Sequence, residues 1–254
     1  MAFTKNQAKL IKSLHDKKGR NETGLFLVEG EKNVVELLNS DFETQYVLCT
    51  ESFFDTNVGP IKSNGAECDI VRQEEIEKVG TLESNDSALA VVKQKESLSP
   101  SVIASETKQS SEIILALDEI KDPGNLGTII RIADWYGIKK IIASENSVDF
   151  YNPKVISATK GSFLRVDFSY ANLAETLPKI GLPIFGALMS GENVHSFPFP
   201  KSGILLMGNE SNGISKELEK IITKKITIPS FGSAESLNVA IATSVILDNW
   251  KRDN

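Results

Sequence analysis

The sequence has 254 residues, of which 41% are hydrophobic and 24% are charged. This composition is ordinary for a globular protein with one large or two medium domains. No run approaches the roughly 18 apolar residues of a membrane span, and the basic N-terminal segment lacks the apolar stretch of a secretory signal, so we expect neither.

The formal net charge of −6 argues against a uniformly basic surface for nucleic acid. The first 20 residues, the basic arm, nevertheless carry a single acid, Asp16, among these basic residues: Lys5, Lys9, Lys12, Lys17, Lys18 and Arg20. A basic arm on an acidic chain favours local contact with phosphate. A solvated terminal helix is the alternative interpretation.

Cys49 and Cys68 are the only cysteines, and no histidine is placed in the sequence to complete a metal-binding set with them. We expect two free, half-buried thiols in a reducing cytoplasm, and no zinc or other metal.

Short apolar runs alternate with helical patterns in the first part of the chain. We expect strands at residues 24–28, 46–48, 68–71 and 88–92, and helices before residue 19, around residues 34–38 and at residues 74–79. This alternation predicts a small α/β domain.

The composition changes at residues 94–111, where Ser, Thr, Gln and Lys dominate. This stretch predicts a linker or an extended surface loop. We therefore expect a domain at residues 1–95, a linker at 96–111 and a second domain at 112–254.

From Ile113 the alternation of strands and helices resumes. We expect strands at residues 113–117, 138–143, 183–188, 204–207 and 225–228, and helices at residues 126–136, 153–160, 215–222 and 236–250. Short, continuously apolar strands between helices predict an α/β fold with a mainly parallel sheet covered on both faces.

The first candidate site follows the strand that ends at Leu117. After a Pro-Gly turn, Asn125 is placed to cap a helix that begins at Leu126. Arg131, less than two turns further on, would add to the positive field at the helix start and favour a phosphate. The alternative is a surface arginine paired with Asp134 or Glu119.

The second candidate is the loop at residues 208–213, which has a glycine at each end. Glu210 in this loop is expected either to pair with Arg131 or to orient polar ligand atoms. The loop matches neither a Walker sequence nor a dinucleotide fingerprint. A simple turn with a solvated glutamate is the alternative.

The third candidate is the stretch at residues 228–240. Ser236 is expected to cap the C-terminal helix, and Asn238 then lies in its first turn, where a short amide is a good ligand group. Helix capping without any further function is the alternative.

Taken together and in this order, the motifs resemble the SpoU/TrmH family of RNA 2′-O-ribose methyltransferases, within the SPOUT class. The resemblance covers residues 113–250 and rests on DPGNLGTIIRIADWYG from Asp122, LLMGNESNGIS from Leu205 and IPSFGSAESLNVAIA from Ile228. Ser211 and Ala240 are small departures from the family pattern. The N-terminal part is similar to the ribosomal-protein-L30e-like substrate-binding domain that many members carry.

The resemblance implies a deep trefoil knot, S-adenosylmethionine as cofactor, and a homodimer with composite active sites. It also implies two sets of site residues. The catalytic positions would be Asn125, Arg131, Glu210, Ser236 and Asn238, and the cofactor would lie against Met207, Gly208, Asn209, Ile228, Ser236, Leu237 and Asn238.

The expected activity is methylation of a ribose 2′-hydroxyl in structured RNA. The L30e-like domain favours ribosomal RNA over transfer RNA as the partner. Two other classes stay open from the sequence. One is a non-catalytic RNA-binding or ribosome-assembly factor, and the other is a nucleotide-dependent oxidoreductase, which the missing glycine fingerprint disfavours.

Overall fold

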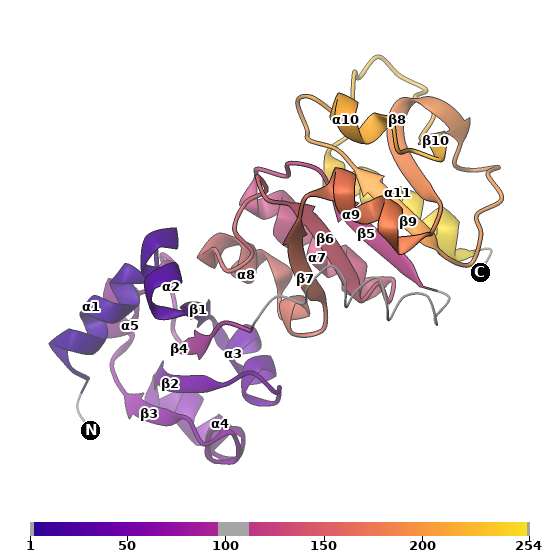
Figure 1. Ribbon diagram of the computed structural model, residues 1–254. Coiled ribbons are helices and arrows are strands. Elements are labelled where there is room, and N and C mark those ends of the chain that lie inside the picture. Colours follow the sequence, from indigo (N-terminus) through magenta and orange to yellow (C-terminus); the bar gives the residue numbers. More distant parts are fainter. Residues whose placement is uncertain (1–2, 96–111, 253–254) are drawn as a thin grey trace. The chain divides into compact units, whose positions relative to one another are not determined.

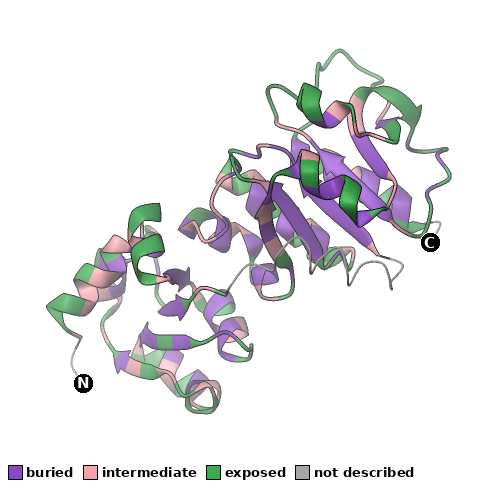
Figure 2. Cartoon of the chain, in the orientation of Figure 1, coloured by how far each residue is buried: buried purple, intermediate pink, exposed green. Residues whose placement is uncertain are grey.

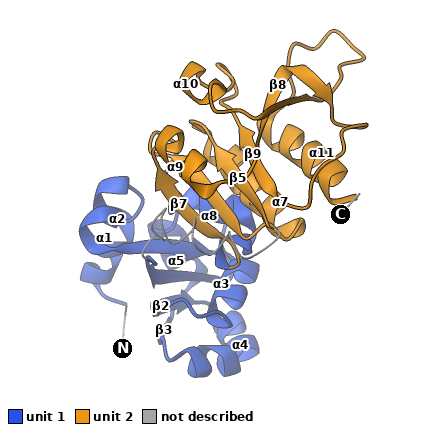
Figure 3. Cartoon of the chain, turned by 45° about the vertical axis from the view of Figure 1, so that its right-hand side comes forward, with its two compact units in different colours: residues 1–96, 149–164 blue, residues 97–148, 165–254 orange. Residues whose placement is uncertain are grey.

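A computed structural model describes residues 3–95 and 112–252, so the expected linker at 96–111 lies outside the described residues. The chain forms two compact units, which Figure 3 colours separately. The first unit is built from residues 1–96 and 149–164, and the second from residues 97–148 and 165–254.

The first unit contains a four-stranded sheet in the order β1-β4-β2-β3 (Figure 1). Its strands are β1 (Leu25–Glu29), β2 (Thr44–Cys49), β3 (Glu67–Ile70) and β4 (Ala88–Lys93). The helices are α1 (Lys5–Ser13), α2 (Lys17–Thr23), α3 (Glu31–Leu38), α4 (Glu51–Asn64), α5 (Gln73–Val79), α8 (Pro153–Thr159) and the 3-10 turn η1 (Ser162–Leu164). The four strands expected for this region are confirmed, whereas α2 and α4 were not expected.

Residues 149–164 are held in the first unit by a buried ion pair and by aromatic packing. Arg20 is 2% exposed and donates from Nη2 to Asp149 Oδ2 at 2.6 Å. The ring of Phe26 on β1 lies 4.5 Å from that of Tyr151 and 6.0 Å from that of Phe163. Because its charge is buried and paired, Arg20 is not exposed for contact with a phosphate.

The two cysteines face each other from adjacent strands of this sheet. Both are free thiols, as expected, and their Sγ atoms lie 3.4 Å apart. The hydrogen bond with Cys68, together with burial, raises the pKa of Cys49, and the same bond lowers the pKa of Cys68.

The second unit contains a six-stranded sheet in the order β10-β8-β9-β5-β6-β7, and every neighbouring pair is parallel. Its strands are β5 (Ile113–Leu117), β6 (Lys140–Ser144), β7 (Asp167–Ala171), β8 (Ile184–Asn193), β9 (Gly203–Met207) and β10 (Lys224–Thr227). Its helices are α7 (Pro123–Trp135), α9 (Leu173–Ile180), α10 (Lys216–Glu219) and α11 (Val239–Arg252). The expected parallel α/β sheet is confirmed; β7 and α9 were not expected.

Both faces of this sheet are covered, and Figure 2 shows its central strands as buried. On one face Ile114 and Leu206 pack against α9 and α10 through side chains such as Leu177 and Leu218. Helices α7 and α11 pack on each other at the opposite face. The trefoil knot stays a prediction. No helix among residues 3–95 and 112–252 has the length and apolarity needed to cross a membrane.

Removing Arg20 should destabilise the first unit, because Asp149 would lose the partner of its partly buried carboxylate. We expect Arg20→Met to lower the free energy of unfolding by about 3 kcal/mol in a urea titration. Lys18→Met is the control, since the Lys18–Glu22 pair is 3.8 Å long and exposed and contributes less than about 0.5 kcal/mol. Equal losses in the two variants would contradict this role for Arg20.

Candidate active site

The centre of the site is the point where β5 and β9 end side by side. Leu117, the last residue of β5, is in register with Met207, the last residue of β9. The next residue, Asp118, donates its backbone N–H to Met207 O at 2.8 Å. Because ligands of parallel α/β sheets bind beyond the carboxyl ends of the strands, the two following loops begin at a favourable place.

The side chains of Asp118 and Asn209 form hydrogen bonds between the loop after β5 and the loop after β9. Asp118 is 4% exposed, and its Oδ2 accepts the backbone N–H of Ser215 at 2.8 Å. Asn209 donates from Nδ2 to the backbone oxygen of Glu119 at 2.7 Å. Glu119 has a positive φ of 53°, a conformation that is rare for residues other than glycine. The loop after β5 is therefore held in a specific shape by the loop after β9.

The loop at residues 208–213 closes on itself. Asn209 and Gly213 exchange two backbone hydrogen bonds of 2.9 Å, and Asn209 Oδ1 also accepts the N–H of Ser211 at 2.8 Å. A Cβ added to Gly208 would lie 2.2 Å from the backbone carbon of Gly213. Only glycine fits at position 208, because the chain returns directly over it. The loop is thus an ordered turn that presents Glu210 at its tip.

The helix caps differ from those expected. Helix α7 begins at Pro123, and Asp122 caps it by accepting the N–H of Asn125 at 2.7 Å, so the expected cap at Asn125 is wrong. Helix α11 begins at Val239, and Asn238 Oδ1 accepts the N–H of Ala240 at 2.9 Å. The expected cap at Ser236 is therefore also wrong.

The side chains of Asn125 and Asn238 belong to one hydrogen-bond network. Asn238 donates from Nδ2 to Asn125 Oδ1 at 2.8 Å. Asn125 in turn donates from Nδ2 to Glu210 Oε1 at 2.8 Å. The network joins residues that are far apart in the sequence: Asn125 in the first turn of α7, Glu210 in the loop after β9, and Asn238 in front of α11. It holds one oxygen of the Glu210 carboxylate and leaves the other available to a ligand.

Arg131 is exposed and has no hydrogen bond or ion pair to any residue that the structure describes. The partners considered from the sequence are otherwise engaged. Asp134 accepts from Arg165 Nη2 at 2.9 Å, Glu119 pairs with Lys121 at 3.6 Å, and Glu210 binds Asn125. Since α7 begins earlier than expected, Arg131 lies about two turns inside the helix, beyond the strongest field of its N-terminus.

The remaining predicted residues lie in the same unit. Met207 is buried at the end of β9, and Gly208 follows it. Ile228 begins the loop after β10, which continues past Ser236 and Leu237 to Asn238. The backbone N–H groups of residues 230–237 have no partner within the described part of the chain. Free donors beside the half-exposed Leu237 suit a flat, polar-edged ligand such as an adenine.

Sequence reasoning did not assign roles to Asp118 and Asp122. Asp118 directly follows a buried apolar strand, which is a usable signal for a residue that organises a loop. Asp122 precedes a proline, and proline is favoured at the first position of a helix, so the pattern could have identified the cap.

The chain was compared with known proteins. Residues 112–248 match the SpoU rRNA Methylase family, and residues 5–90 match the MRM3-like substrate binding domain. The chain belongs to the SpoU rRNA methylase family. The SpoU/TrmH resemblance is thereby confirmed, and so is a substrate-binding domain at the N-terminus.

Individual SpoU relatives resemble this chain along nearly its whole length. It is 30% identical to the 23S rRNA guanosine(2553) 2′-O-methyltransferase RlmP of Bacillus subtilis, covering 96% of this chain and 95% of the relative. A TrmH-family structure from Porphyromonas gingivalis matches with a TM-score of 0.87 at 32% identity, covering 100% of both chains. An AdoMet-bound rRNA methyltransferase from Sinorhizobium meliloti matches with a TM-score of 0.85 at 28% identity, covering 99% of this chain and 96% of that one.

The two functions of Asn238, capping and linking, can be separated by substitution. Asn238→Ala removes both and should lower the free energy of unfolding by about 1 kcal/mol, measured by urea denaturation. Asn238→Asp keeps the capping oxygen and should unfold like the wild type, although it cannot donate to Asn125. If Asn238→Asp were as unstable as Asn238→Ala, the capping assignment would be wrong.

Proposed function

We propose that the Asn125–Glu210–Asn238 network is the place where this SpoU-family chain methylates the 2′-hydroxyl of a ribose in ribosomal RNA. The observation that carries this proposal is the convergence of three polar side chains, from three segments far apart in the sequence, at one edge of the parallel sheet. RNA ribose 2′-O-methylation is the activity of the family. We favour ribosomal RNA because RlmP, a relative over 95% of its own length, is named for 23S rRNA.

The proposed methyl donor is S-adenosylmethionine, which the Sinorhizobium meliloti relative holds. When bound, it supplies an activated methyl group on a sulfonium. We assign its site to Met207, Gly208 and Asn209 on one side and to Ile228, Ser236, Leu237 and Asn238 on the other. The free N–H groups of residues 230–237 support this assignment, because they can bind the edge of an adenine.

The chain's own part in the chemistry is to orient the ribose. Its 2′-oxygen must approach the methyl carbon in line and lose a proton, and good alignment can lower the barrier substantially. Glu210 is held at Oε1 by Asn125, so its Oε2 can accept a hydrogen bond from the 2′-hydroxyl. Asn238 prevents Asn125 from rotating, and the carboxylate thereby keeps its direction.

Arg131 is proposed to hold the phosphate beside the target ribose and to stabilise the negative charge that develops on its oxygen. The side chain is exposed and unpaired among the described residues, as a phosphate-binding arginine must be. It follows Asn125 by six positions, which places it about 120° around α7 from that residue. We therefore propose that Arg131 completes the site of a second copy in a homodimer.

Large apolar side chains near Arg131 support this dimer. Trp135, one helical turn after Arg131, is 84% exposed, and Ile241 on α11 is 56% exposed. Since α7 packs on α11, these side chains belong to one pair of helices, and a second copy would bury them. We propose the cytoplasm as the location, where free thiols such as Cys49 and Cys68 persist.

Loss of the Arg131 guanidinium should affect the reaction and not cofactor binding. We expect Arg131→Ala to bind S-adenosylmethionine with wild-type affinity in a calorimetric titration, and to slow transfer of a labelled methyl group to ribosomal RNA by about 100-fold to 1000-fold. Arg131→Lys, which keeps the charge but not the fork of donors, should be intermediate. Wild-type turnover by Arg131→Ala would reject the assignment.

Mixed dimers test whether Arg131 acts across the interface. Arg131→Ala and Asn238→Ala chains, carrying different tags, are co-expressed and the heterodimer is purified by both tags. If each site takes Arg131 from one copy and Asn238 from the other, one site keeps both residues and about half the wild-type activity returns. If the two residues act within one copy, neither site of the heterodimer keeps both residues, and its activity stays near the mean of the two variant homodimers.

A further inference from the structure

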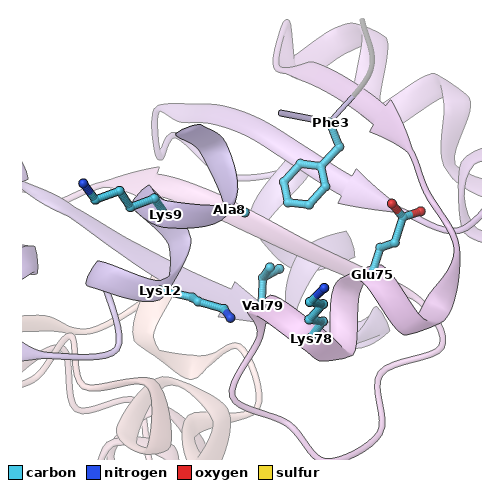
Figure 4. A pocket seen from close by; sticks show the side chains of 7 residues that line it. All are labelled: Phe3, Ala8, Lys9, Lys12, Glu75, Lys78 and Val79. Atoms are coloured by element: carbon cyan, nitrogen blue, oxygen red, sulfur yellow. The ribbon is translucent and has the colours of Figure 1, made fainter. Parts of the chain in front are cut away.

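A hollow between α1 and α5 in the first unit is separate from every residue assigned to methyl transfer. Its volume is about 350 Å³, within the range of small-ligand sites. Phe3, Ala8 and Val79 form its apolar part, and Lys9, Lys12 and Lys78 lie around it (Figure 4). Glu75 is the only acid among the lining residues.

The apolar part is fixed in place. Phe3 and Ala8 pack against the buried cluster that contains Ile11 and Ile76. The Phe3 side chain therefore contacts the core while remaining partly exposed. The turn that follows α1 contacts the end of α5, because His15 Nε2 lies 2.8 Å from Val79 O. An aromatic face held in this way offers a surface on which a flat group can stack.

The charges around the hollow are predominantly positive and available. Lys9, Lys12 and Lys78 are exposed and form no ion pair with any residue in the described ranges. Figure 4 shows Lys12 and Lys78 reaching from their two helices toward Val79. Glu75 is engaged elsewhere, since its Oε2 accepts the backbone N–H of Arg72 at 3.1 Å and lies 3.7 Å from Arg72 Nε.

We infer that this hollow binds one unpaired nucleotide of the RNA substrate, with the base stacked on Phe3 and the phosphate between Lys12 and Lys78. The inference rests on the proposed function for the identity of the ligand. Single-stranded RNA is recognised by such combinations of aromatic faces and unpaired cations. A base inside a duplex is stacked on both faces and paired along one edge, so it cannot enter a hollow of this kind.

The test compares binding of a fluorescein-labelled oligouridine and of a blunt RNA duplex of equal length to the full chain, by fluorescence anisotropy over a range of salt concentrations. We expect Phe3→Leu, which keeps the apolar packing, to weaken oligouridine binding about tenfold. Lys12→Gln/Lys78→Gln should weaken it about as much and make its salt dependence shallower. Duplex binding should change less than twofold in both variants.

The matched control is Lys5→Gln/Lys17→Gln, which removes the same charge from exposed positions outside the hollow. If this control weakens oligouridine binding as much as Lys12→Gln/Lys78→Gln, the attraction is diffuse and the inference is wrong. The inference also fails if Phe3→Leu binds like the wild type, or if duplex binding falls in parallel with oligouridine binding.

A methyl-transfer assay of the wild type on ribosomal RNA, run alongside, distinguishes failure of the proposed function from failure of the nucleotide site. Absence of methyl transfer by the wild type would reject the proposed function. Methyl transfer by the wild type, together with unchanged oligouridine binding by the hollow variants, would reject only the nucleotide site.

Discussion

The buried carboxylate of Asp118 is the constraint on which the arrangement of the site depends. It lies at the end of β5, and it accepts the N–H of Ser215, which follows the loop after β9. A buried carboxylate without such a donor would be costly, so the loop after β9 must bring its backbone to this point. Asn209 adds a second bond from that loop to the backbone of Glu119. The two loops therefore adopt their shapes together.

This mutual support explains why the Glu210 side chain has a defined position although it is exposed. The side chain stands at the tip of a turn that closes through Asn209 and Gly213, and Gly208 allows the chain to cross over itself. Asn125 then holds one carboxylate oxygen from the first turn of α7. A side chain positioned by its surroundings before the substrate arrives needs little reorganisation during the reaction.

The sequence predicted the strands of both sheets that are continuously apolar, because such runs have few other uses in a chain of this composition. It did not predict α4, which contains Gly59-Pro60, a pair that favours a turn. In the structure this segment is a helix that kinks at Asn57. The three site loops were located by their glycines and short polar residues. Their mutual contacts, such as Asn125 with Asn238, depend on tertiary packing that no local pattern encodes.

Which residue caps a helix decides which side chains remain available to the candidate site. Asp122 and Asn125 can both cap α7, just as Ser236 and Asn238 can both cap α11, and residue type alone does not choose between them. If Asn125 were the cap, its side-chain oxygen would be bound to the backbone of its own helix. Because Asp122 performs that task, the oxygen of Asn125 accepts from Asn238 and its nitrogen donates to Glu210.

The Arg131 side chain is likewise left available by the contacts of its neighbours. An arginine near several acids usually forms an ion pair, and a paired guanidinium would have to be released before it could hold a phosphate. Here Asp134 is occupied by Arg165, and Glu119 by Lys121. These neighbouring pairs keep Arg131 available without the cost of breaking a contact. Within the described part of the chain, these neighbouring acids and bases satisfy one another and leave the Arg131 guanidinium free for the phosphate contact that we propose.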